Sequence, residues 1–449
     1  MRGAWVSTMT AAWLLGACGP TEDGPARDEI RQPSGLAMSP DASVLLVTNG
    51  NWDRRAAAGT LTVVDMAALD AAMVSPGAAS SGASCRTGDE AYVRCSAAAF
   101  IDAERTTVLG DGVGNIVIDR PAGNDGPARV LIPVASPPQV VWLDLLGAAG
   151  DAARVDCGQD DDGRCDDAHR IQTTPSGGTE LPGSPARLSV GDLGDRFAYL
   201  PHLLGGSISL ISLDGEAGPQ LSDVVGEFYK EDVFEEDELS GGFAVARRPC
   251  DPDSPPVASR DCTRPLLYST HRYFPGMREF TVAPGRDRVL AGHEVSLEQL
   301  NATAVEGRPF MADLAFEDET GAFLLAVATT PAALIRIRTE VDEAGVLTES
   351  IVGSLPLCAN PNALALYRPP GGEPLALVAC RAAAAVAVVG LSSFRVLRTV
   401  DVGEGPSEVI VDPTRAVALV ANTDDDSVSV IGLDSARADY LAERTRIGR

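Results

Sequence analysis

Short apolar runs separated by turn residues recur along most of the chain, and they are clearest near its C-terminus. There the valine-rich runs 405–411 and 416–422 flank a tight turn, and a third run follows at 427–433. β-Branched residues in short runs bounded by glycine, proline and aspartate are typical of strands. The same pattern occurs at residues 33–49 and continues at 59–65. The sequence therefore predicts sets of antiparallel strands joined by tight turns.

The three-strand unit recurs along the chain. Its copies begin near residues 33, 114, 184, 241, 309, 360 and 405. A fourth strand follows most copies, for example at 395–402 and 440–447. One such sheet cannot bury its apolar faces alone, so neighbouring sheets stack and close into a ring. We therefore expect an all-β fold, a seven-bladed β-propeller with four-stranded antiparallel blades, over residues 33–449. A pair of β-sandwiches is the alternative, but it would not predict the recurring unit.

Two copies also share a short phrase, Leu46-Val-Thr-Asn49 in the first and Leu419-Val-Ala-Asn422 in the last. Each phrase follows a turn of proline and aspartate and precedes a valine-rich strand. In these residues the chain resembles the YVTN-family β-propeller repeat proteins. The sixth copy matches partly, and the second to fifth match in the spacing of their strands more than in their residues. Many members of this family are extracytoplasmic, so the resemblance implies an extracytoplasmic propeller. It implies no single activity, because some similar seven-bladed proteins are lactonases and others bind partners or cell-surface polymers.

The first 18 residues differ from the rest of the chain. An apolar stretch at 4–17 has the length of a signal peptide and is too short to span a bilayer permanently. It ends in Leu15-Gly-Ala-Cys18, which resembles the bacterial lipobox, whose cysteine becomes the lipidated first residue of the mature protein. We expect residues 1–17 to be a lipoprotein signal peptide and 18–32 a lipidated tether. An ordinary secretory signal is the alternative. The resemblance implies an extracytoplasmic protein, lipid-anchored to the bacterial envelope. The residue after the cysteine is not aspartate, which favours the outer membrane.

The other eight cysteines fall into four close pairs. An oxidising compartment favours disulfides, and pairing between neighbours costs the least loop-closure entropy. Metal binding is the alternative, but no pair has C-x-x-C spacing and no histidine flanks a pair at the spacing of a zinc site. We therefore expect four local disulfides: Cys85–Cys95, Cys157–Cys165, Cys250–Cys262 and Cys358–Cys380.

The charge of the chain excludes one class of partner. The chain has 36 basic and 63 acidic residues and a net charge of −27. It therefore lacks the basic character that neutralises phosphates, and we expect no nucleic-acid partner. With 45% hydrophobic and 22% charged residues, the composition is that of a globular protein. An acidic run at 231–238 is expected to be an exposed insertion that could attract a basic partner.

Equivalent positions of propeller blades lie on one ring, near the mouth of the central channel where such folds commonly bind ligands. Polar residues end the predicted second strand in several copies, and they are the candidate ligand-binding residues Asn49, His202, His271 and Asn422. They form either a small polar site able to bind a metal or a set of side chains that pack and hydrogen-bond at the rim. The Asp-rich loop at 156–167 resembles a calcium site in composition but not in EF-hand spacing. Calcium is therefore a candidate cofactor only.

Catalytic signatures are missing from the sequence. It contains neither a G-x-S-x-G nucleophile elbow nor a phosphate-binding loop of the G-x-x-x-x-G-K-[ST] type. We therefore assign no catalytic residue and expect a binding or scaffold module at the cell envelope, with an envelope protein or polysaccharide as its partner. The alternative is a metal-assisted lactonase-like hydrolase with its site in the channel, where Asn49 and Asn422 could hold calcium. A structural coat component is a third interpretation.

Overall fold

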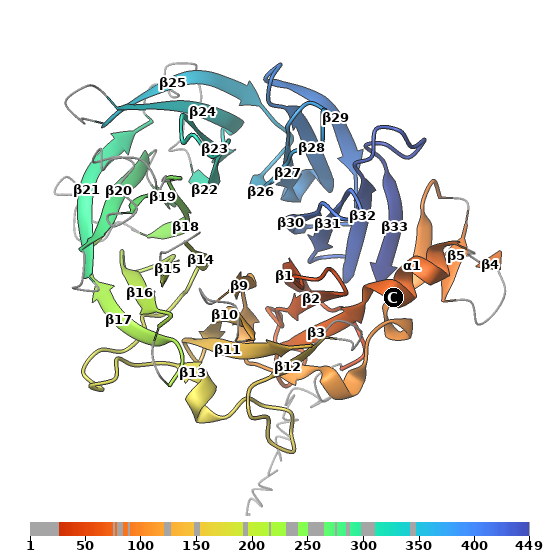
Figure 1. The fold of residues 1–449 in the computed structure, drawn as a ribbon, viewed down its shortest axis with the longest axis horizontal. Helices are drawn as coiled ribbons and strands as arrows, with labels where there is room; N and C mark the ends of the chain where they lie inside the picture. Colours follow the sequence, from red (N-terminus) through yellow and green to blue (C-terminus); the bar gives the residue numbers. More distant parts are fainter. Residues whose placement is uncertain are drawn as a thin grey trace, which may run out of the picture.

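Seven antiparallel sheets surround a central axis and form a ring (Figure 1). The computed structural model describes residues 27–74, 77–78, 84–88, 90–120, 127–147, 153–191, 196–214, 217–229, 241–249, 265–273, 276–283, 288–297, 310–341 and 347–448. In each blade the first strand lies innermost and the last strand lies at the outer rim (Figure 1). The predicted all-β, seven-bladed propeller is therefore confirmed. The predicted signal peptide, Cys18, the acidic run 231–238 and the Cys250–Cys262 pair lie outside the described residues.

Blades 1 to 3 are the less regular part of the repeat. Blade 1 contains β1 (Pro33–Met38), β2 (Val44–Asn49), β3 (Thr60–Asp65) and β7 (Thr107–Val108). Blade 2 contains β8 (Asp111–Val113), β9 (Val117–Asp119), β10 (Ala128–Ser136), β11 (Gln139–Leu146), β12 (Arg154–Asp156) and β13 (Arg170–Ile171). Blade 3 contains β14 (Ser189–Val190), β15 (Phe197–Pro201), β16 (Ile208–Ser212) and β17 (Gln220–Val225). In blade 2 the predicted innermost strand is split, because both β8 and β9 pair with β10.

Blades 4 to 7 each have four consecutive strands. Blade 4 contains β18 (Gly242–Arg247), β19 (Leu266–His271), β20 (Gly276–Ala283) and β21 (Arg288–Ser296). Blade 5 contains β22 (Phe310–Phe316), β23 (Phe323–Thr330), β24 (Ala332–Val341) and β25 (Leu347–Pro356). Blade 6 contains β26 (Pro361–Tyr367), β27 (Leu375–Cys380), β28 (Ala385–Gly390) and β29 (Arg395–Asp401). Blade 7 contains β30 (Pro406–Asp412), β31 (Val417–Asn422), β32 (Ser427–Gly432) and β33 (Glu443–Gly448).

Blade 1 sends an excursion between its third and fourth strands that we did not predict from the sequence. It begins with helix α1 (Met66–Val74) and continues through β4 (Gly77–Ala78), β5 (Cys85–Thr87) and β6 (Val93–Ser96). Strand β6 pairs in parallel with β33, so the excursion extends the outer edge of blade 7 (Figure 1). Residues from early and late in the chain therefore share one sheet where the ring closes.

The core lies between the blades. Every residue of β27, β28 and β31 is buried, because each blade is covered by a neighbour on both faces. This explains why strands such as β27 and β28 are continuous apolar runs rather than alternating patterns. The rim strand β29 is instead largely exposed. No helix in the described part of the chain is long and apolar enough to cross a membrane.

Candidate functional site

The four candidate ligand-binding residues lie at the ends of second strands, on one side of the ring. We call this side the second-strand face. Asn49 ends β2 in blade 1, His202 follows β15 in blade 3, His271 ends β19 in blade 4 and Asn422 ends β31 in blade 7. All four side chains are buried. The structure thus places them at equivalent positions of their blades. The two asparagines lie in the adjacent blades 7 and 1, and the two histidines lie in the adjacent blades 3 and 4.

His202 uses both ring nitrogens within its own blade. Its Nδ1 lies 3.1 Å from the carbonyl oxygen of Gly183, which can only accept, so Nδ1 carries the proton. Its Nε2 lies 2.8 Å from the Ser209 hydroxyl and accepts from it. Burial lowers the pKa of His202 to about 4, although nearby backbone carbonyls oppose this shift. The imidazole is therefore neutral at pH 7 and fixes the turn between the second and third strands.

His271 has a similar environment in blade 4. Its Nε2 donates to the carbonyl oxygen of Tyr229 over 2.8 Å, and its Nδ1 accepts from the backbone N–H of Tyr273 over 3.2 Å. Burial lowers the pKa of His271 to about 4, and the positive charge of Arg278 lowers it further. Both histidines therefore spend their ring nitrogens on neighbouring protein groups, and a ligand-binding role for them stays a prediction.

The two asparagines hold strand ends together in blades 1 and 7. Asn49 Oδ1 accepts from the backbone N–H of Arg31 over 2.9 Å, and its Nδ2 donates to Thr60 Oγ1 over 2.8 Å. Asn422 Nδ2 donates to Ser429 Oγ over 2.8 Å and to the Ser427 hydroxyl over 3.0 Å. Asn422 Oδ1 is buried without a hydrogen-bond partner among the described residues. Among the polar atoms of the four candidate side chains, Asn422 Oδ1 is therefore the one that has no hydrogen-bond partner among the described residues and could accept from a ligand.

A charged cluster that we did not identify from the sequence lies on the axis of the ring. Arg187, which precedes β14 in blade 3, forms a two-pronged ion pair with Glu408 on β30 in blade 7, with distances of 2.7 and 2.9 Å. Asp313 on β22 in blade 5 lies 3.7 Å from the same guanidinium. Blades 3, 5 and 7 are not adjacent, so these side chains meet across the central channel. The two carboxylates outweigh desolvation and raise the pKa of Arg187, which stays charged.

The repeat itself carried a signal for this cluster. Each of the three charged residues stands two positions after the start of its innermost unit: Arg187 in Pro185-Ala-Arg-Leu, Asp313 in Met311-Ala-Asp-Leu and Glu408 in Pro406-Ser-Glu-Val. In blades 1 and 6 the equivalent residues are Gly35 and Ala363. A charge in an otherwise apolar innermost strand points to the axis, because that position faces the channel.

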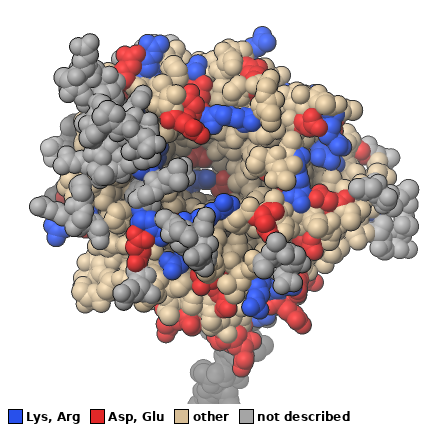
Figure 2. Space-filling model, in the orientation of Figure 1, with Lys and Arg blue, Asp and Glu red and all other residues tan. Residues whose placement is uncertain are grey.

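The second-strand face also carries an arginine in an aromatic setting. Arg272 follows β19, and its guanidinium lies 5.3 Å from the centre of the Phe243 ring and 5.9 Å from that of Phe310. One of its nitrogens, Nη1, donates to the carbonyl oxygen of Met311 over 3.0 Å. No described carboxylate lies within ion-pairing distance, and burial lowers the pKa of Arg272. Figure 2 shows a hollow at the centre of the ring with basic side chains at its edge.

Blades 1 and 7 enclose a second polar hollow, with a volume of about 530 Å³. Its lining residues are Arg31, Gln32, Asp53, Arg55, Thr423, Asp424 and Asp426. Most of these charges are already paired: Asp53 contacts both Arg31 and Arg55, and Asp426 accepts from the backbone of Gln32 over 2.8 Å. Because its charges are already paired with one another, the hollow is a poor candidate for a binding site for a charged ligand.

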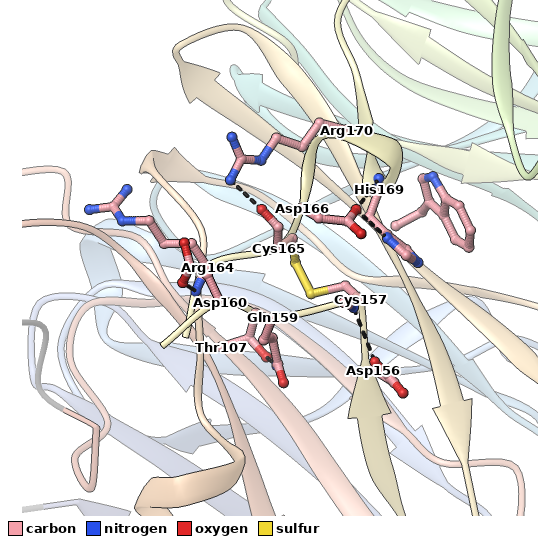
Figure 3. Close-up of a disulfide and its surroundings, with 12 residues drawn as sticks. Thr107, Asp156, Cys157, Gln159, Asp160, Arg164, Cys165, Asp166, His169 and Arg170 are labelled. Atoms are coloured by element: carbon pink, nitrogen blue, oxygen red, sulfur yellow. Dashed lines mark hydrogen bonds and ion pairs between the residues drawn. A yellow bond between two sulfur atoms is a disulfide. The ribbon is translucent and has the colours of Figure 1, made fainter. Parts of the chain in front are cut away.

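Three of the four predicted disulfides lie in the described part of the chain, and all three are formed. They are Cys85–Cys95, Cys157–Cys165 and Cys358–Cys380. Figure 3 shows the Cys157–Cys165 bond in the Asp-rich loop. There Asp160 Oδ1 accepts from the backbone N–H groups of Asp162 and Arg164, at 3.0 and 2.8 Å. The loop thus uses its carboxylates to hold its own turns.

Comparisons with known proteins place the chain by fold. No family model and no curated protein sequence matches it. A chain of hydrazine synthase from Kuenenia stuttgartiensis aligns with 95% of this chain over 99% of its own length, with a TM-score of 0.55 and 14% identity. A provisionally named 6-phosphogluconolactonase from Bacteroides fragilis aligns with 91% over 95% of its length, with a TM-score of 0.54 and 14% identity. The β-propeller domain of Cps50 (Swd1) from Myceliophteria thermophila aligns with 89% over 96%, with a TM-score of 0.52 and 10% identity. At such identities the likeness establishes the propeller fold alone.

Proposed function

We propose that this protein is an extracytoplasmic β-propeller, anchored by lipid on Cys18 at the outer membrane, that binds an envelope protein or polysaccharide. Two features support the location. The residues Leu15-Gly-Ala-Cys18 resemble a lipobox, and the three described disulfides suit an oxidising compartment, since cytosolic thiols stay reduced.

Arg272 is the observation that carries the binding role. A guanidinium removed from water is costly unless an anion pairs with it. At the equivalent position of blade 6, Arg381 has such a partner, because its Nη2 lies 2.9 Å from Asp424. Arg272 instead faces Phe243 and Phe310, and it meets no described carboxylate. A carboxylate or another anionic group of a partner would complete this site, with the aromatic rings supplying apolar contact.

The net charge of −27 shapes how such a partner binds. A strongly acidic protein repels anionic molecules at long range, so steering does not drive the encounter. Recognition at Arg272 therefore depends on short-range contacts. This favours a partner with an anionic group beside an apolar surface over a uniformly charged polymer.

The binding role is tested with three tagged proteins expressed in the source bacterium: wild type, Arg272→Met and the matched control Arg381→Met. Each is purified from detergent extracts of the envelope, and the associated proteins and polysaccharides are quantified. We expect one partner to accompany wild type and Arg381→Met and to fall at least tenfold with Arg272→Met. If nothing is enriched over a tag-only control, or if all three recover it equally, the binding role of Arg272 is refuted.

The anchor is tested separately by labelling cells with radioactive palmitate. We expect the wild-type protein to be labelled and the Cys18→Ser protein to carry no label. Equal labelling of the two proteins would contradict lipidation at Cys18, whatever the outcome at Arg272.

The alternative is a metal-assisted lactonase-like hydrolase. Its support is the fold shared with the Bacteroides fragilis protein. It is less well supported than binding, because Arg187 with its two carboxylates joins the blades across the channel, and Asn49 is engaged by Arg31 and Thr60. Turnover of a panel of lactones in the presence of calcium, lost on substitution of Asn422, would favour the hydrolase.

A further inference from the structure

Three side chains with metal-binding atoms meet at the seam between blades 4 and 5, away from the channel. They are Glu279 on β20, His293 on β21 and Glu349 on β25. One donor atom from each lies within 4.8 Å of the other two. His293 Nδ1 contacts Glu279 Oε2, and its Nε2 lies 3.2 Å from Glu349 Oε2. The cluster combines two carboxylates with one imidazole.

A β-bulge brings His293 beside Glu279. Arg278 pairs with Glu294 and Phe280 pairs with Ala291, so the two residues Gly292 and His293 oppose Glu279 alone. Such bulges bend a strand and re-aim its side chains. A bulge between the third and fourth strands also occurs in blades 3, 5, 6 and 7. The fold therefore supplies the bulge, and in blade 4 the sequence places a histidine in it.

The carboxylate of Glu349 is held from behind. The hydroxyl of the buried Tyr268 donates to Glu349 Oε1 over 2.8 Å, which leaves Oε2 directed toward His293. The Glu349 side chain is 8% exposed, that of Glu279 18% and that of His293 50%. Metal-binding carboxylates are commonly oriented by such outer hydrogen bonds. The cluster is thus supported on its inner side and open to solvent at the imidazole.

The charges of the cluster favour the binding of a cation. Burial raises the pKa of Glu279, the nearby His293 lowers it, and the negative charge of Glu349 raises it again. Two carboxylates at this distance from one imidazole carry more negative charge than one imidazolium can neutralise. A divalent ion would balance the charge of both carboxylates.

We propose that Glu279, His293 and Glu349 bind one divalent transition-metal ion, with Zn²⁺ as the best fit to one nitrogen and two oxygen ligands. One imidazole nitrogen and one oxygen of each carboxylate supply three ligands, and water fills the open side. The ion would join β20 and β21 of blade 4 to β25 of blade 5. It would therefore cross-link the rims of adjacent blades and stabilise the closed ring. This site is independent of the proposed binding role of Arg272.

The test uses the full, untagged chain after removal of metal with a chelator. Zn²⁺ is titrated by calorimetry, and the melting temperature is followed with and without Zn²⁺. We expect one ion per chain and a higher melting temperature with Zn²⁺, since a ligand that binds only the folded state stabilises it. His293→Ala and Glu349→Gln should each lose this ion. Tyr268→Phe should weaken binding about 10–100-fold, as expected for an outer-shell partner.

His169→Ala is the matched control. His169 Nδ1 lies 2.7 Å from Asp166, so it is also a histidine paired with a carboxylate, but with one instead of two. This variant should bind Zn²⁺ as wild type does. Failure of the wild-type protein to bind Zn²⁺ would overturn the proposal. So would unchanged binding in His293→Ala, or loss of binding in His169→Ala, because the ion would then lie elsewhere.

Discussion

Blades 6 and 7 differ from blades 3 and 4 in the residues at the ends of their second strands and in how those residues are paired. In blades 6 and 7 the second strands are completely buried, and the arginine that follows β27 is paired with Asp424 of the next blade. In blades 3 and 4 the equivalent strand ends hold His202 and His271, and the arginine after β19 meets no described carboxylate. Blade 6 thus pairs this arginine with a carboxylate of the neighbouring blade. Blades 3 and 4 instead hold titratable side chains at these strand ends, and Arg272 has no anionic partner among the described residues.

The largest effect is expected where the two regions are joined across the channel. Replacing Arg187 by alanine leaves Glu408 and Asp313 buried without their cation, so we expect the free energy of unfolding to fall by about 3–5 kcal/mol. Urea unfolding measures this loss. Arg187→Met with Glu408→Gln removes two of the three charges and should recover part of it. A loss below about 1 kcal/mol for Arg187→Ala would show that the two regions are held independently.

Acid should destabilise the protein through the buried histidines of blades 3 and 4. Below pH 6.5 the unfolded chain protonates His202, whereas the folded chain does so only near pH 4. The unfolded state thus binds more protons between these values, and stability falls with falling pH by up to about 3 kcal/mol for this histidine. His271 follows the same rule. We expect His202→Gln to flatten the dependence of the unfolding free energy on pH between 6.5 and 4. Identical slopes in wild type and His202→Gln would contradict the assigned neutral state.

The smallest expected effect is the difference in stability lost when one or the other of two disulfides is removed. Cys358–Cys380 in blade 6 spans 22 residues, and Cys157–Cys165 in blade 2 spans 8. The longer loop restricts the unfolded chain more, so replacing its cysteines by alanine should cost about 3 kcal/mol, against about 2 kcal/mol for the shorter loop. Thermal or urea unfolding of the two double variants measures the difference. The reverse order would indicate that folded-state contacts, rather than chain entropy, determine these contributions.

The fold could be predicted because its strongest determinant is local. Runs such as residues 417–421 are apolar throughout, since both faces of their strand are covered, and the turns between such runs are rich in proline and aspartate. Neighbouring cysteines could be paired for the same reason, and three of the four pairs are confirmed. The excursion with helix α1 was missed, because nothing in the repeat predicts an interruption between the third and fourth strands of blade 1. The YVTN resemblance and the lipobox stay predictions.

The site could be predicted only in part. The repeat predicted that Asn49, His202, His271 and Asn422 end second strands, but their chemistry depends on partners such as the Gly183 carbonyl oxygen, which no pattern specifies. The Arg187 cluster joins residues 221 positions apart in sequence. It becomes visible only when the innermost strands are aligned with one another. The Glu279–His293–Glu349 cluster depends on a bulge, and a one-residue shift in register cannot be read from apolar periodicity.

The pairing of β6 with β33 bears on the order in which the chain can mature. Ile447 lies opposite Cys95, so a strand made early pairs with a segment that is synthesised much later. Until then β6 has an open edge, which can pair with other chains. The Cys85–Cys95 bond fixes the β5–β6 hairpin, but β5 occupies the opposite edge of β6, so the edge that later pairs with β33 stays open. The sheet of blade 7 is therefore complete only once β33 is in place, and a chain lacking β33 would expose two unpaired edges, β6 and β32, at once.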